Sequence, residues 1–111
     1  LNDYKKAYAT EAKASEILYK RKAYEVDREY EMLRERFDKL KTRLKMTMKL
    51  VVAQDKKFKN ERNRFQQGRT TTFQVVQFEQ DLANTQLLQL RYERDLITVY
   101  NQLKLFSGVE L

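Results

Sequence analysis

The chain turns at RFQQGRTTTF, residues 64–73, and this stretch decides the fold. The 111 residues include no proline and only two glycines, so Gly68 is the interior residue best suited to end a helix in the left-handed conformation. Thr71, followed three residues later by Gln74, has the spacing of a capping box that begins a new helix. We therefore predict two helices folded back on each other, with function at an exposed, basic, hydroxyl-rich tip.

The predicted architecture is an all-α, elongated antiparallel hairpin, a coiled coil with helices of unequal length. A long helix covers residues 1–67, the tip covers 68–71, a shorter return helix covers 72–106, and residues 107–111 leave the helix at Ser107-Gly108. At 1.5 Å per residue, the first helix is a rod of roughly 100 Å. A helix of that length requires packing partners, because propensity alone does not hold it together in water.

The first helix carries one apolar seam at heptad-like spacing. Its members are Tyr19, Ala23, Val26, Tyr30, Leu33, Phe37, Leu40, Leu44, Met48, Val51, Phe58 and Phe65. The steps alternate between four and three until Leu40, Leu44 and Met48, where two steps of four follow each other. This spacing predicts a stutter, a local unwinding of the supercoil.

The return helix carries two seams. The first comprises Val75, Phe78, Leu82, Thr85, Gln89, Tyr92, Leu96, Val99, Leu103 and Phe106, and the second comprises Phe73, Val76, Gln80, Ala83, Leu87, Leu90, Arg94 and Ile97. A coiled-coil dimer needs one stripe, so two offset stripes predict packing against two neighbours, as in the wall of a bundle or tube.

A turn at Gly68 also predicts the register, with facing residues whose numbers add to about 138. Phe65 then lies level with Phe73, and Met48 with Leu90. The return helix ends opposite about residue 32, so residues 1–31 have no partner within the chain. We expect another part of a longer protein, or another copy, to cover them. Because the chain begins with Leu1 rather than methionine, we expect it to be a fragment of something longer.

Composition excludes several classes of function. The chain lacks cysteine and histidine and has no serine in a nucleophile elbow, so we expect neither an enzyme nor a cofactor or metal site. The net charge of +7 invites a nucleic-acid interpretation. However, the basic residues alternate with acids, which is typical of a solvated helix face, and no nucleic-acid-binding motif is present. No signal peptide and no apolar run of membrane-spanning length is recognisable.

The tip and the return helix resemble a known family. The pattern Arg64-Phe65-x-x-Gly68-Arg69-Thr70, followed by FQVVQFEQDL at residues 73–82, is similar to the second periplasmic helical hairpin of TolC-type outer membrane efflux proteins. Residues 90–108 also fit the closing helix of that family. The resemblance covers residues 58–111, about half of the chain, whereas residues 1–57 match only as one long helix.

The resemblance implies a role in transport. Three protomers would form a helical tunnel, an exit duct for efflux or type I secretion in the outer membrane of a Gram-negative bacterium. This segment would lie in the periplasm, and membrane contact would come from parts outside it. The tip would dock a periplasmic adaptor (a membrane fusion protein) and, through it, an inner-membrane transporter. The implied docking residues are Phe65, Gly68, Arg69, Thr70 and Thr71.

Further expectations concern gating and an alternative. By analogy with the family, Arg91, Arg94 and Asp95 are candidates for an ion pair between protomers that holds the tunnel closed. Arg94 interrupts the second seam, and the alternative interpretation is a side chain whose stem lies along that seam while its charged head remains in water. Gln74 stands where many relatives carry an acid, which departs from the family pattern. The alternative function is a stand-alone coiled-coil scaffold or dimerisation module with no role in transport.

Overall fold

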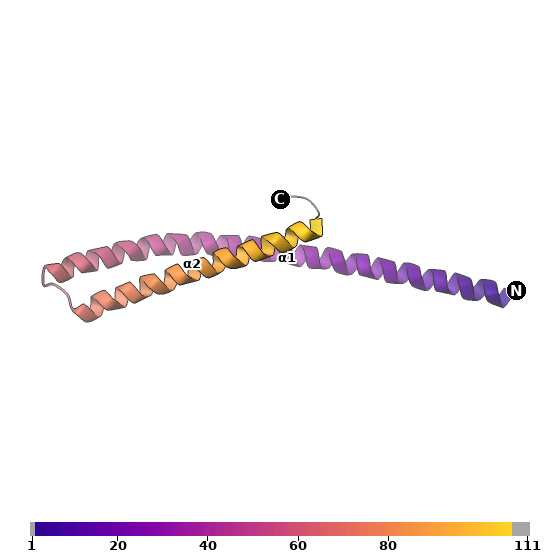
Figure 1. Ribbon diagram of the computed structural model, residues 1–111, viewed down its shortest axis with the longest axis horizontal. Coiled ribbons are helices and arrows are strands. Elements are labelled where there is room, and N and C mark those ends of the chain that lie inside the picture. The colour runs from indigo at the N-terminus through magenta and orange to yellow at the C-terminus, as the bar shows by residue number, and fades with distance from the viewer. Residues whose placement is uncertain (1, 108–111) are drawn as a thin grey trace.

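The structure, a computed structural model, describes residues 2–107 as two helices, α1 (Asn2–Gln66) and α2 (Thr72–Ser107). Figure 1 shows α2 folding back along α1, which continues alone far beyond the end of α2. The molecule measures 99 × 26 × 14 Å, and its radius of gyration is 26.9 Å, against about 13 Å for a compact chain of this length. The predicted all-α hairpin is confirmed, with helix ends within one residue of the prediction. Of the predicted exit at 107–111, Ser107 is still helical, and residues 108–111 lie outside the described residues.

Gly68 ends α1 as the sequence predicts. Its φ angle is +71°, in the left-handed region. The backbone N–H of Gly68 donates to the carbonyl oxygen of Phe65 at 3.0 Å, and that of Arg69 donates to the carbonyl oxygen of Arg64 at 2.8 Å. These two bonds form a Schellman motif, which satisfies carbonyl groups that the last turn of a helix otherwise leaves free.

Thr71 caps α2, also as predicted. Its side-chain oxygen accepts a hydrogen bond from the backbone N–H of Gln74 at 3.2 Å. Its carbonyl oxygen accepts the first intrahelical bond, from the N–H of Val75 at 3.3 Å. Between the Gly68 stop and the Thr71 start, the chain reverses direction within residues 67–71.

The seam of α1 follows an unbroken heptad repeat, and the predicted stutter is wrong. Thr47, rather than Met48, occupies the seam: Thr47 is 7% exposed, whereas Met48 is 47% exposed. The hydroxyl of Thr47 donates to the carbonyl oxygen of Arg43 at 2.8 Å, so its burial leaves no polar group unpaired. The steps of three and four therefore continue through Leu40, Leu44 and Thr47 without interruption.

The apolar core lies where the C-terminal half of α2 packs on α1. Leu40, Val99 and Leu103 form its buried centre, with flanking aromatic and leucine side chains from both helices. The rings of Phe37 and Tyr100 lie 6.3 Å apart, and these two numbers add to 137, which agrees with the predicted register. Phe73, however, is 75% exposed on the outer side of α2. The register predicts Phe73 level with Phe65, but its side chain is not packed against α1 there.

Towards the tip, the seam becomes polar. Positions seven residues apart along α1 read Leu33, Leu40, Thr47, Gln54 and Glu61. Glu61 is only 6% exposed, and a side-chain oxygen of Gln54 is buried without a hydrogen-bond partner. The tip half of the hairpin is thus held by fewer apolar contacts than the other half.

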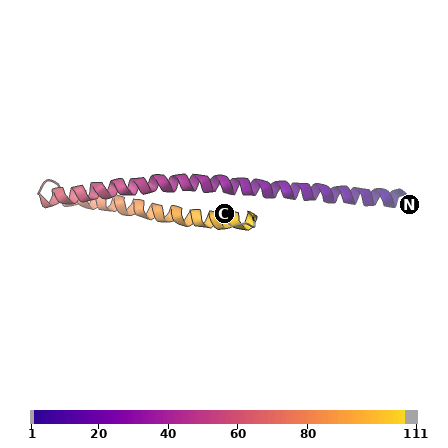
Figure 2. The ribbon, with the colours of Figure 1, turned by 90° about the horizontal axis from the view of Figure 1, so that it is seen from above.

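The first part of α1 has no cover within the described chain. Residues 2–29 are all exposed, and the prediction that this segment lacks a partner here is confirmed. Viewed from above, α2 stops well short of the N-terminal end of the molecule (Figure 2).

Candidate functional site

The predicted docking residues lie together at the end of the rod because the turn itself joins them. Gly68, Arg69 and Thr71 are exposed, Thr70 is half-buried, and the Phe65 ring retains much of its exposure. The guanidinium of Arg64 donates to the carbonyl oxygen of Arg69 at 3.5 Å, a weak tie across the turn. The tip therefore presents one aromatic ring, one free guanidinium and threonine hydroxyls to whatever meets it end on.

The charges behind the tip are only partly neutralised. A side-chain nitrogen of Arg64 lies 3.3 Å from a carboxylate oxygen of buried Glu61, and the Lys59 ammonium lies 2.8 Å from the Asp55 carboxylate. Arg62 lies over the ring of Phe58, 5.7 Å from its centre. The guanidinium of Arg69 has no acidic partner within residues 2–107. The resulting field at the tip is positive and suits a negatively charged surface.

The residues predicted to gate do not form a network within this chain. The guanidinium of Arg94 donates two hydrogen bonds, of 3.1 and 3.2 Å, to one carboxylate oxygen of its neighbour Asp95. Arg91 is exposed and forms no ion pair within the described residues. The head of Arg94 is largely exposed, as expected of a side chain whose charged end remains in water. An ion pair between protomers stays a prediction.

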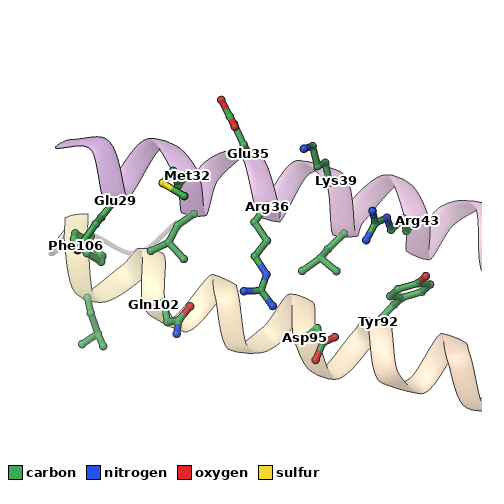
Figure 3. Close-up of a pocket in the computed structure, with 13 residues that line it drawn as sticks. Glu29, Met32, Glu35, Arg36, Lys39, Arg43, Tyr92, Asp95, Gln102 and Phe106 are labelled. Atoms are coloured by element: carbon green, nitrogen blue, oxygen red, sulfur yellow. The ribbon is translucent and has the colours of Figure 1, made fainter. Parts of the chain in front are cut away.

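Asp95 also lines an open groove between the helices, close to the end of α2. The groove has a volume of about 720 Å³ and is lined by residues of both helices, from Glu29 to Arg43 and from Tyr92 to Phe106. Figure 3 shows the side chain of Arg36 reaching from α1 toward α2, between Gln102 and Asp95. The lining combines apolar side chains with carboxylates and basic side chains.

The outer face of α2 is the second notable surface. Its second seam leaves Phe73, Val76, Leu87, Leu90 and Ile97 substantially exposed. Since successive helix residues are 100° apart, these positions lie on the side of α2 opposite to the seam on α1. α2 therefore has one apolar face covered by α1 and another that remains bare.

Residues 2–107 contain neither a metal-binding cluster nor a membrane-spanning helix. No group of three or more metal-binding side chains comes together there. Nor does either helix, within residues 2–107, contain a stretch of sufficient length and apolarity to cross a bilayer. The tip and the bare face of α2 are two surfaces with a distinct chemical character.

Comparison with protein-family models, with curated proteins and with solved structures found no match for this chain. The resemblance to TolC-type proteins therefore rests on the sequence pattern of residues 58–111 alone.

The buried polar residues near the tip were missed by the sequence-based interpretation. Glu61 and Gln54 occupy seam positions, although charged and amide side chains are usually placed on the solvent face. The repeat of seven residues from Leu33 through Leu40 and Thr47 was the signal that would have located them. A search for apolar residues alone passes over it.

Proposed function

We propose that this chain is the periplasmic hairpin of a TolC-like outer membrane duct, part of the wall of a tunnel for efflux or type I secretion. The observation that carries the proposal is the bare apolar face of α2, opposite to the face on α1. A helix in a tube packs against a neighbour on each side, and it therefore needs two apolar faces. A two-stranded scaffold needs only one, and the bare face would then have no role.

The unequal helices support the same proposal. Residues 2–29 of α1 are exposed along their whole length, and in the proposed duct a further helix lies beside them. In a tunnel of three protomers, neighbouring hairpins and the rest of each chain would cover both this segment and the outer face of α2. The tip then projects from the end of the tube.

The projecting tip is proposed to dock the periplasmic adaptor, through which the duct connects to an inner-membrane transporter. The stop at Gly68 and the cap at Thr71 shape a short turn whose Arg69 and Thr70 side chains are not required by the hairpin itself. Because both helix ends are satisfied by their own backbone and by Thr71, these two side chains are available to a partner.

The test is transport by the parent protein after replacement of the tip side chains. Arg69→Trp with Thr70→Trp leaves the Gly68 turn and the Thr71 cap intact, and we expect normal assembly with loss of dye efflux or protein secretion. The matched control, Arg69→Lys with Thr70→Ser, keeps charge and hydroxyl and should retain transport. Full transport by the tryptophan variant, with normal amounts of protein in the outer membrane, would refute docking at the tip.

A further inference from the structure

All of the net positive charge of this chain comes from one segment. Residues 39–69 hold eleven Lys and Arg against two acids, a balance of +9. Residues 1–38 hold nine of each, and residues 70–111 hold three basic residues against five acids. The second half of α1 is therefore strongly basic, whereas the rest of the chain is close to neutral.

Part of this charge lies on one side of α1, here called the lysine flank. Its members are Lys41, Lys45, Met48, Lys49, Val52, Lys56 and Lys59, all of them exposed. Five of the seven directly follow a residue of the seam at 40, 44, 47, 51 or 58. Since successive residues are 100° apart, the flank lies beside the seam and turns away from α2.

The flank has the composition of a helix-docking surface. Met48 and Val52 are four residues apart, so they form one exposed apolar spot, and lysines border it at both ends and on the side away from the seam. Lys59 is paired with Asp55, whereas Lys45, Lys49 and Lys56 form no ion pair within the described residues. An apolar centre with charged borders is the arrangement by which coiled-coil helices select an oppositely charged partner.

We propose that the lysine flank docks an acidic amphipathic helix of a second protein, with apolar side chains on Met48 and Val52 and carboxylates facing the lysines. A second copy of this chain does not supply such a helix over about four heptads, because its most acidic stretch, residues 25–31, is short and carries a balance of only −3. The proposal is independent of the proposed transport role, since it needs only the hairpin.

Nucleic acid fits this surface less well. A phosphate backbone would pair with the lysines but leave Met48 and Val52 against polar groups, and the flank has no aromatic ring on which a base can stack. An anionic membrane also fits less well, because two apolar side chains are few for a helix that lies in the lipid interface.

The experiment measures binding of the 111-residue chain to a synthetic acidic helix of about four heptads, with leucine at the core positions and glutamate beside them. Binding is followed by fluorescence anisotropy at about 0.15 M salt. The test variant is Lys45→Glu, Lys49→Glu and Lys56→Glu. The control variant, Lys6→Glu, Lys13→Glu and Lys22→Glu, makes the same charge change on the exposed first part of α1. A milder set, Lys45→Gln, Lys49→Gln and Lys56→Gln, serves if the glutamate variant loses helicity.

We expect the flank variant to bind about tenfold more weakly or worse, the glutamine set to show a smaller loss, and the control to remain within about twofold. Met48→Gln with Val52→Gln should weaken binding without any change of charge. Equal losses in flank and control variants would overturn the proposal, as would equal binding of polyglutamate, which lacks the apolar residues. Tighter binding of duplex DNA or of anionic vesicles at the same salt would overturn it as well.

Discussion

Replacement of Gln54 by leucine should stabilise the hairpin. Gln54 occupies a seam position of α1, half-buried, and its side-chain oxygen is buried without a hydrogen-bond partner. An unsatisfied buried acceptor costs about 1–3 kcal/mol, and leucine removes that cost. Leucine also adds apolar burial, worth about 1.5–3 kcal/mol when complete and roughly half of that at a half-buried site. From these two contributions we expect the free energy of unfolding to rise by about 2 kcal/mol, the lower end of their sum.

The assay is urea unfolding followed by circular dichroism. At a slope of about 2 kcal/mol per molar urea, the expected gain raises the midpoint by about 1 M. Gln86→Leu, at an exposed position on α2, is the matched control and should change stability by less than about 0.5 kcal/mol. Both are measured at two protein concentrations, because association through exposed apolar faces would add apparent stability. An unchanged or lower midpoint for Gln54→Leu would refute the reasoning.

Two other substitutions test the core and the turn. Leu103→Ala removes a side chain with 0% exposure from the core cluster, and we expect it to cost about 2–5 kcal/mol in urea unfolding. Leu105→Ala, at a position 85% exposed, is the control and should cost less than about 0.5 kcal/mol. Similar losses for the two variants would contradict the packing. Gly68→Ala places a methyl group where no atom beyond the two neighbouring residues in the chain lies within 4 Å, so the left-handed backbone is what opposes it. We expect a cost of about 1–2 kcal/mol in thermal unfolding. A cost above about 3 kcal/mol would mean that the turn is more crowded than described.

The sequence alone predicted the turn, the cap, the helix lengths and the bare first part of α1. These features depend on local chemistry: Gly68 is the interior glycine, and Thr71 stands three residues before Gln74. The seam near the tip was predicted wrongly, since Met48 was placed there on hydrophobicity. Thr47 takes the position instead, because the seven-residue geometry decides it and the threonine hydroxyl bonds to its own helix.

The candidate site was predictable only in part. The turn brings Phe65 to Thr71 together, and a glycine stop with a threonine cap is enough to place them at one end of the rod. What contacts them belongs to another molecule, so no pattern within this chain specifies it. The same holds for Arg94, whose bond to Asp95 follows from their adjacency and does not reveal a second protomer.

The bare first part of α1 has a thermodynamic consequence. Residues 2–29 gain no tertiary stabilisation, and the helix there is sustained only by propensity and by local pairs such as Glu16 with Lys20. Its backbone amides should therefore exchange with solvent far faster than those around Leu40 and Val99. Any molecule that covers this segment must also suppress its fraying. The entropy lost when the segment is ordered offsets part of the free energy gained from the new contacts. Affinity at this end will fall below what the buried area alone suggests, and binding will appear as a gain in helicity.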